Sequence, residues 1–418
     1  MLQEMIKTRR FFHTIPEPAW LEFQTTVELI NRLKDMGYAV EYGKSIHGGP
    51  RMGFPSEETI NAHKDQMKID AGFNISQILD GYTGAIVKLD TGQPGPTIGL
   101  RFDIDANDLL ENNESGHRPV DEGFVSTNPK AMHACAHDGH MTIGLFVAKW
   151  LMENRKDLKG RYIIAFQPAE EGARGALSMV NTHHFDNIDY FLGMHLGINL
   201  PSGKIGVGSV GIFATSKIDV ELNGRSAHAG VNPEDGKNAL LAASSAILNL
   251  HTLPQISKGM SRLNVGVAQG GSGRNVVPGN ASFKMEVRGE EDEIVEYLIK
   301  RTNEVVEGAA KQYGVDFKVQ EVGSGQAIKV HDEEFYDEID KLLKSKGYDT
   351  VRNNNFNASE DVTYFMNKVS EDGGKSIHLL IGSDLKAGHH NDKFDFNEED
   401  MLIAYNIITT TIEYLQDK

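Results

Sequence analysis

Buried strands separated by helical segments are the main pattern along the chain. Continuous apolar runs occupy 161–167 and 189–194, and further strands are predicted at 84–90, 97–105 and 376–382. Runs without polar alternation are typical of strands that are buried on both faces of a mostly parallel sheet. Because helical patterns lie between several of these strands, we predict an α/β fold with helices on both faces of the sheet.

The spacing of apolar residues also predicts the helices of this α/β region. The first 38 residues are expected to form a helix, a break at Ile15-Pro16-Glu17-Pro18 and a second helix that stops at Gly37. Further helices are predicted at 57–67, from Gly139 onward, and at 176–182, 333–346 and 398–416.

A different pattern begins near residue 212 and predicts a second domain. Apolar and polar residues alternate at 217–222, 261–268 and 281–288, as in strands with one solvated face. Helical segments are predicted at 238–251 and 291–314. The order β-α-β-β-α-β is that of a ferredoxin-like α+β plait. We therefore predict that 213–325 is inserted into a larger domain made of 1–212 and 326–418.

Composition excludes several classes of partner. The formal net charge of −17 over 418 residues disfavours nucleic acid and anionic membranes, which require clustered Lys and Arg. A single cysteine excludes an internal disulfide and fits a reducing cytoplasm. The N-terminal residues lack the apolar stretch of a signal peptide, and no apolar run approaches the ~18–20 residues that span a bilayer. We expect a cytoplasmic protein.

The stretch from Met132 to His140 carries the densest potential metal chemistry. It contains three histidines, an aspartate and the only cysteine within nine residues. Thiolate, imidazole and carboxylate groups bind borderline metals such as zinc. On an extended segment Cys135 and His137, two residues apart, would point the same way and reach one metal. The alternative is a buried cysteine that lies near polar loop histidines.

Four groups of potential ligands follow predicted strands or the loops beyond them. They are Cys135 and His137, Glu170 and Glu171, His195, and His389 and His390. Ligands bind at the carboxyl ends of strands in open α/β sheets, so we expect these groups to converge. Five such ligands suit two metal ions. Because adjacent residues of an extended chain point apart, one glutamate can bind metal while the other serves as general base.

Several motifs carry a resemblance to a known family. They are Arg9 to Glu17, His133 to His140, Gln167-Pro168-Ala169-Glu170-Glu171-Gly172, the surroundings of His195, Ser226 to Gly230, and His389-His390. Together they resemble the amidohydrolase branch of the M20 metallopeptidases, almost from end to end of the chain. The resemblance implies a zinc-exopeptidase-like catalytic domain with an inserted lid that dimerises.

The resemblance also implies roles for particular residues. The implied metal ligands are Cys135, His137, Glu171, His195 and His390. Glu170 becomes the general base that later protonates the leaving amine, with a pKa raised by burial. Asp103 would orient the site. His228 in the lid would reach the partner's site and stabilise the oxyanion. Arg274 and Asn275 would hold a substrate carboxylate.

The implied reaction is metal-dependent hydrolysis of an amide between an acyl or aroyl group and an amino acid. The resemblance within the branch, carried by stretches such as Arg51-Met52-Gly53 and Glu171 to Ala176, implies p-aminobenzoyl-glutamate as the expected substrate. Hydrolysis of other N-acyl amino acids, of the hippurate or indoleacetyl type, stays open. The possibility that the chain is a subunit that is inactive without a homologous partner also stays open. The resemblance is compatible with a homodimer and with a heterodimer that contains such a partner.

The identity of the two divalent ions is also left open by the sequence. Cys135 favours zinc, whereas carboxylate ligands with open positions permit manganese. One position departs from the family pattern, since Ala136 replaces the usual glycine between two ligands. If this position needs a positive φ, the alanine strains the loop by about 1 kcal/mol or more. If it is extended, the change is nearly neutral.

Overall fold

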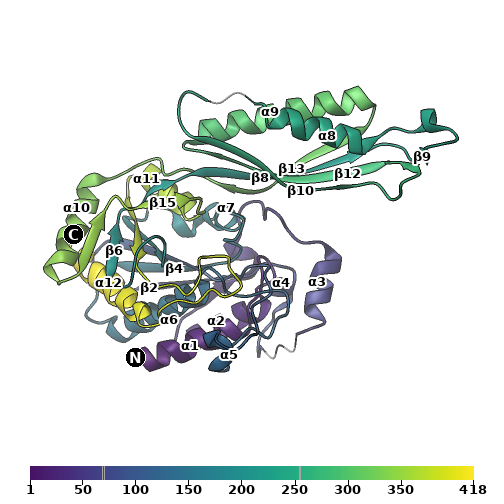
Figure 1. Ribbon diagram of the computed structural model, residues 1–418. Helices are drawn as coiled ribbons and strands as arrows, with labels where there is room; N and C mark the ends of the chain where they lie inside the picture. The colour runs from purple at the N-terminus through teal and green to yellow at the C-terminus, as the bar shows by residue number, and fades with distance from the viewer. Residues whose placement is uncertain (68, 70, 254–255) are drawn as a thin grey trace. The chain divides into compact units, whose positions relative to one another are not determined.

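The computed structural model describes residues 1–67, 69, 71–253 and 256–418, and it divides into two compact units. Unit 1 comprises Met1–Val210, Lys329–Asn357 and Asp361–Lys418. Unit 2 comprises Gly211–Ile328 and Ala358–Glu360. Figure 1 shows the ribbon of both, and each unit is described by itself.

An eight-stranded sheet forms the centre of unit 1, in the order β1-β2-β4-β3-β5-β16-β6-β14. The strands are β1 Val40–Tyr42, β2 Ala85–Asp90, β3 Thr97–Asp103, β4 Arg161–Gln167, β5 Tyr190–Leu196, β6 Lys204–Val207, β14 Asp349–Arg352 and β16 Lys375–Ile381. The four central strands β4, β3, β5 and β16 run parallel, whereas β1, β2 and β6 introduce antiparallel pairings. The predicted mostly parallel sheet is confirmed.

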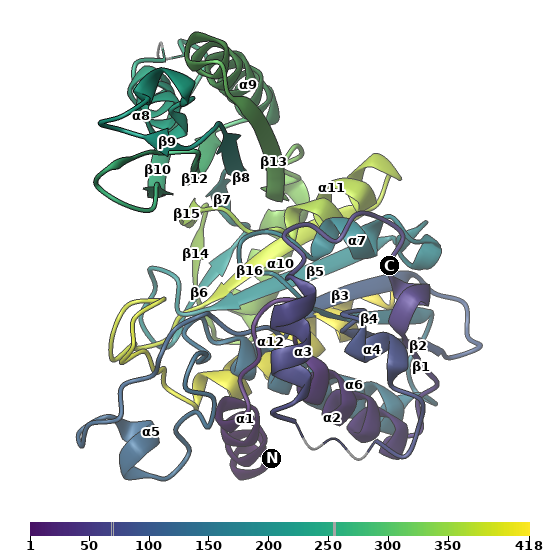
Figure 2. The same ribbon diagram turned by 90° about the vertical axis from the view of Figure 1, so that its right-hand side faces the viewer.

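Helices cover both faces of this sheet, as predicted (Figure 2). One face carries α1 Leu2–Thr14, α2 Phe23–Asp35, α6 His137–Asn154 and α12 Asp400–Leu415, and the other carries α7 Ala176–Val180 and α11 Thr363–Glu371. Unit 1 also holds α3 Glu57–Lys64, α4 Ser76–Leu79, α5 Arg118–Asp121 and α10 Glu333–Ser345. Helix α6 approaches the sheet closely at Gly144, where an added Cβ would lie 2.6 Å from the Phe102 ring. Among the described residues, no helix is long and apolar enough to cross a membrane.

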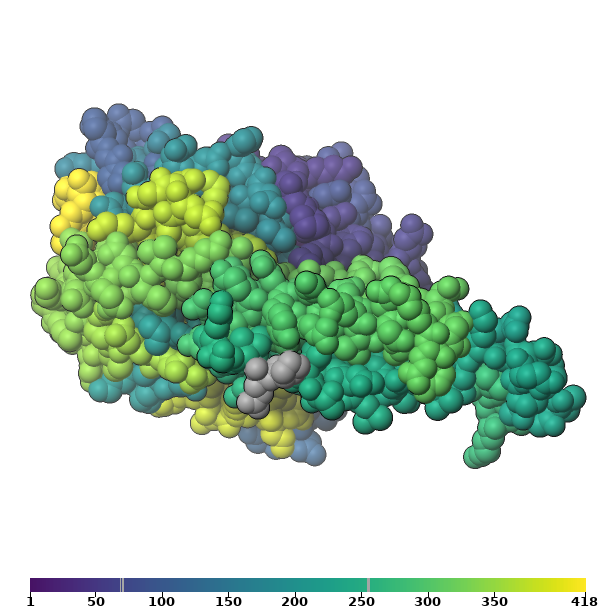
Figure 3. Space-filling view, turned by 90° about the horizontal axis from the view of Figure 1, so that it is seen from above, coloured from purple at the N-terminus to yellow at the C-terminus, as the bar shows by residue number. Residues whose placement is uncertain are grey.

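Unit 2 contains an antiparallel sheet with helices on one face. The strands are β8 Ala214–Asn223, β10 Ser261–Gly270, β12 Asn280–Gly289 and β13 Asp316–Gly325, in the order β10-β12-β8-β13. Helices α8 Ala239–Leu250 and α9 Asp292–Tyr313 cover it, and Figure 3 views the unit from their side. Alternate residues of β12 are buried beneath them. The chain order β8-α8-β10-β12-α9-β13 confirms the predicted ferredoxin-like plait.

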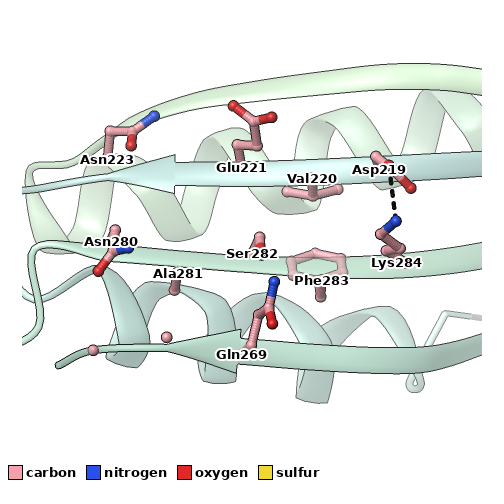
Figure 4. Close-up of a pocket in the computed structure, with 12 residues that line it drawn as sticks. Asp219, Val220, Glu221, Asn223, Gln269, Asn280, Ala281, Ser282, Phe283 and Lys284 are labelled. Carbon is pink, nitrogen blue, oxygen red and sulfur yellow. Dashed lines mark ion pairs between the residues drawn. The ribbon is translucent and has the colours of Figure 1, made fainter. Parts of the chain in front are cut away.

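The uncovered face of the unit 2 sheet has a polar hollow of about 610 Å³ (Figure 4). Its walls come from β8, β10 and β12 and include an ion pair between Asp219 and Lys284 at 3.8 Å. None of the predicted site residues lines this hollow. The chemistry expected from the sequence therefore lies elsewhere.

Candidate metal centre

The predicted ligands of unit 1 gather at the carboxyl ends of the parallel strands. Glu170 and Glu171 follow β4, His195 is the penultimate residue of β5, and His390 lies in the loop after β16. Cys135 precedes helix α6, whose first residue is His137. Because β4, β3, β5 and β16 are mutually parallel, their carboxyl ends share one edge of the sheet. Residues far apart in sequence therefore meet there.

Cys135 belongs to two groups of potential ligands. In one group it lies with His137 and His195, and in the other with Glu171 and His390. Within each group the ligand atoms lie within 4.8 Å of one another. Cys135 Sγ is 3.5 Å from His195 Nε2. The five predicted ligands thus form one cluster in which the thiol is shared.

Hydrogen bonds fix which nitrogen of each histidine faces the cluster. His137 Nδ1 donates to the Asp105 carbonyl at 2.9 Å, and His195 Nδ1 donates to the Leu196 carbonyl at 2.8 Å. Each Nε2 therefore keeps its lone pair, as a metal ligand must. In the described part of the chain, His137 Nε2 and Glu171 Oε1 are buried without a hydrogen-bond partner. Such orphaned atoms fit a metal ion, which would satisfy them.

The surroundings of Cys135 favour the ionised form of its thiol. Burial by itself would raise the pKa of Cys135, but His389, His195 and His137 lie close by and hold it well below its ordinary value. The thiolate is the form of cysteine that binds metal. The electrostatics of the cluster therefore agree with its donor set.

The two adjacent glutamates face different histidines. Glu170 Oε2 lies 3.8 Å from His137 Nε2, and Glu171 Oε1 lies 3.4 Å from His390 Nε2. The expectation that the glutamates lie in extended chain is wrong, because both are in a turn after β4 that begins with Ala169 at a φ of 55°. The two carboxylates lie within 4.8 Å of each other and of a nitrogen of His137, but each pairs with a different histidine, so they can hold different roles.

The segment between Cys135 and His137 is not extended either. Ala136 is the N-cap of α6 in the left-handed conformation, with φ 67° and ψ 15°. Cys135 and His137 approach each other because the chain turns at Ala136, rather than because alternate side chains of a strand point the same way. The strained alternative for this alanine is therefore the one observed.

We expect Ala136→Gly to change the free energy of unfolding by less than about 1 kcal/mol. Glycine removes the strain of the left-handed alanine, roughly 1 kcal/mol, but loses a buried methyl group of similar value. Ala136→Val should destabilise the protein by at least ~2 kcal/mol, since a branched side chain is strained there and has no space. Urea denaturation of both variants checks this, and a tolerated valine would contradict it.

Asp103 lies behind the cluster and acts through His140. Its Oδ1 accepts from His140 Nδ1 at 2.7 Å, and its Oδ2 accepts from Arg101 at 2.7 Å. Burial alone would raise the pKa of Asp103, but His137, His140 and Arg101 hold it below its usual range. His140 Nε2 in turn accepts from the backbone N–H of Leu196 at 3.0 Å. These hydrogen bonds, which run from Asp103 through His140 to Leu196, hold the end of β5, which carries the neighbouring His195.

Asp105 is a site residue that the sequence pattern did not reveal. Its two carboxylate oxygens accept the backbone N–H groups of Glu170 and Glu171 at 3.0 and 2.9 Å. Oδ1 also lies 3.3 Å from His137 Nδ1. One buried carboxylate therefore positions the glutamate turn and a histidine together. The signal available in the sequence was its place two residues after Asp103, just beyond β3.

We expect Asp105→Asn to weaken metal binding by roughly 10–100-fold, the usual cost of losing a group that orients metal ligands. The amide puts a donor against one of two N–H groups, so the glutamate turn must shift. Competition with a chromogenic chelator measures this affinity. Asp189→Asn is a matched control, because Asp189 accepts the Thr97 N–H at the opposite end of β3. Equal affinity in both variants would contradict the role of Asp105.

Comparison with known proteins places this centre in a family. Residues 99–414 match peptidase family M20/M25/M40. The chain belongs to this family. A Bacillus subtilis M20 protein described as a dinuclear metal-binding peptidase shares the fold, with a TM-score of 0.67 at 22% identity over 100% of this chain and 98% of that one.

Closer relatives of this M20-family chain are hydrolases. It is 40% identical to the indole-3-acetyl-aspartic acid hydrolase of Enterobacter agglomerans, covering 98% of this chain and 95% of the relative. It is also 40% identical to one subunit of the p-aminobenzoyl-glutamate hydrolase of Escherichia coli, covering 96% and 94%. A Klebsiella pneumoniae aminobenzoyl-glutamate utilization protein has a TM-score of 0.81 at 34% identity, covering 98% and 95%. The M20-family chain is a metallo-amidohydrolase.

The other predicted residues of this M20-family enzyme lie together in unit 2. His228 ends the short strand β9 Ala227–His228, which pairs with β11 Val276–Val277. Arg274 and Asn275 directly precede β11 and are exposed, as is His228. The Asn275 carbonyl accepts the Ala229 N–H at 2.9 Å, and His228 Nδ1 accepts the Gly230 N–H at 3.1 Å. Three polar side chains are thus presented at one end of this unit.

Proposed function

We propose that the protein hydrolyses the amide bond of N-aroyl or N-acyl amino acids, foremost p-aminobenzoyl-glutamate to p-aminobenzoate and glutamate. The observation that carries the proposal is the buried cluster in which His137 Nε2 and Glu171 Oε1 have no hydrogen-bond partner among the described residues and lie beside the carboxylate of Glu170. The p-aminobenzoyl-glutamate and indole-3-acetyl-aspartate hydrolases at 40% identity support the substrate class.

We assign the cluster to two divalent ions, either zinc or manganese. Cys135, His137, Glu171, His195 and His390 would hold them. When bound, such ions polarise the amide carbonyl and lower the pKa of water. The shared thiol of Cys135 favours zinc over manganese.

We assign to Glu170 the transfer of a proton from the attacking water to the leaving amine. Its side chain is 10% exposed, and its Oε2 lies near His137 Nε2, whereas Glu171 faces His390. Glu170 takes a proton from the attacking water and delivers it to the nitrogen of the leaving amino acid. One carboxylate thus serves as base and then as acid.

Unit 2 is assigned the role of a lid that supplies polar groups. His228 would donate a hydrogen bond to the oxyanion that develops at the amide carbon. Arg274, together with Asn275, would bind the α-carboxylate of the amino acid through its guanidinium fork. All three side chains are exposed at one end of the unit, which leaves them free to meet a substrate.

We infer that the lid also joins two subunits, either two copies or a copy and a homologous chain. Strand β10 is at the edge of the unit 2 sheet. Leu241 and Leu248, one heptad apart on α8, are 50% and 71% exposed. An open strand edge beside exposed leucines is a surface that pairs with another chain. Sedimentation of the purified chain should give a dimer that Leu248→Glu weakens, and a monomer with intact activity would contradict this.

Indole-3-acetyl-aspartate is the second candidate substrate, because its hydrolase is equally similar to this chain. Both acyl groups carry a flat aromatic ring, and both amino acids are acidic. The lone buried cysteine supports a cytoplasmic location for either reaction.

The test is hydrolysis by the purified, metal-loaded chain of p-aminobenzoyl-glutamate, indole-3-acetyl-aspartate and hippurate. We expect release of free glutamate from the first substrate and none after chelation. Turnover of hippurate alone would reassign the substrate. No turnover of any of the three, with metal bound, would mean that the chain requires a homologous partner or that the proposed reaction is wrong.

A further inference from the structure

The turn that carries Glu170 and Glu171 also carries the guanidinium of Arg174. Arg174 Nε donates to the backbone carbonyl of Glu171 at 2.7 Å. In the described part of the chain, no carboxylate lies within ion-pair distance of Arg174. The side chain is half-buried. A cation held beside a metal ligand without an acid of its own is available to an anionic ligand.

The local backbone holds this guanidinium in place. Gly172 has a φ of 79°, and a Cβ added there would lie 3.2 Å from Arg174 Nε. Glycine at this position therefore leaves room for the side chain to fold back over the turn. Since Nε is engaged with Glu171, the two terminal NH₂ groups remain as a fork, which matches the geometry of a carboxylate. The fork is preorganised, so little entropy is lost when it binds.

The surroundings of Arg51, another half-buried arginine of unit 1, differ from those of Arg174. The Arg51 guanidinium carbon lies 3.7 Å from the Tyr82 ring centroid and 4.0 Å from that of Phe54, and the side chain donates to the Asp80 carbonyl at 2.8 Å. Two aromatic rings and a backbone carbonyl already contact the Arg51 guanidinium. Arg51 fastens its own loop, whereas Arg174 lies on the turn that carries the proposed base.

We propose that Arg174 binds the side-chain carboxylate of the substrate's amino acid and so selects conjugates of dicarboxylic amino acids. This inference rests on the proposed function, because it names the substrate class of the same site. Such a substrate has a side-chain carboxylate in addition to its α-carboxylate. This second carboxylate needs a cation of its own, which the turn after β4 offers at Arg174.

The test compares p-aminobenzoyl-glutamate with its neutral isostere p-aminobenzoyl-glutamine. We expect the unaltered enzyme to prefer the glutamate conjugate in kcat/KM by about 100-fold, the usual effect of a charged hydrogen-bonded pair. Arg174→Met should reduce this preference to within about 5-fold. Arg155→Met is the matched control, because Arg155 also donates to the backbone carbonyl three residues earlier, Met152, at 2.8 Å. The control should keep the full preference.

Three kinetic outcomes would overturn the proposal. They are a wild type without preference, an Arg174→Met variant that keeps both the preference and its activity, and an Arg174→Met variant that keeps the preference because it loses activity on both conjugates equally. The last outcome would show a role in positioning Glu171. Titration calorimetry of both conjugates with metal-loaded protein separates this inference from the proposed reaction. If neither conjugate is hydrolysed, tighter binding of the glutamate conjugate that Arg174→Met removes supports the inference. Equal or absent binding overturns it.

Discussion

Glu170→Gln should lower kcat for p-aminobenzoyl-glutamate about 10³-fold while leaving metal binding intact. A general base contributes roughly 10²–10⁴-fold to such reactions. The amide is similar in size to the carboxylate but has no basic oxygen, so the proton of the attacking water has no acceptor. Glu170 and Glu171 face different histidines, which is why we expect the loss in Glu170→Gln to be confined to the chemical step.

Glu171→Gln provides the comparison for this prediction. Glu171 Oε1 is buried without a hydrogen-bond partner among the described residues, as expected of a metal ligand. Its substitution should therefore reduce both the bound metal and the activity. Metal content after dialysis, measured by mass spectrometry beside kcat, distinguishes the variants. If Glu170→Gln loses metal and Glu171→Gln keeps it, the two roles are reversed.

Arg9→Met should destabilise the protein by roughly 3–5 kcal/mol, the cost of removing one partner from a buried ionic network. Arg9 is fully buried and contacts Asp138, Asp395 and Glu398 at 2.7, 3.1 and 3.3 Å. Methionine would fill much of the space but leave three buried carboxylates without this cation. Asp138 follows His137 directly, so the metal-binding turn should loosen as well. Urea denaturation in chelator measures the change.

The penalty in Arg9→Met should depend on pH in a defined direction. Burial alone would raise the pKa of Asp138 and of Asp395, but Arg9 helps to hold both below their usual range. That stabilisation is present above the ordinary carboxyl pKa of about 4 and is lost as pH falls through the lower folded values. Without Arg9 both pKa values rise, so the variant should recover stability relative to wild type as the pH falls towards about 4.

Arg32→Met is the control for this stability experiment. Arg32 pairs with Glu28 on the surface of α2 at 2.6 Å, and both side chains are about 30% exposed. A partly exposed surface pair of this kind contributes roughly 0–1 kcal/mol. A similar loss in the two variants, or a difference that does not change with pH, would contradict the assignment to buried charge.

The apolar pattern predicted the sheet and the place where the candidate ligands gather. Strand β4 was predicted at its observed residues, because a continuous apolar run is typical of a strand that is buried on both faces of a sheet. The rule that ligands bind at the carboxyl ends of parallel strands predicted that Glu170, His195 and His390 lie close together. Strands of three or four residues, such as β1, β6 and β14, were missed because they are too short to show a period.

The orientation of the predicted ligands depends on long-range contacts that the apolar pattern does not contain. Ala136 turns left-handed at the start of α6, although its side chain gives no local reason to do so, because His137 is tied to the Asp105 carbonyl. The glutamate turn after β4 likewise closes on the carboxylate of Asp105 rather than continuing the strand. These bonds join residues more than 30 positions apart, and such long-range contacts override local preference. The apolar pattern therefore determined where the ligands meet, and the folded chain determined their orientation.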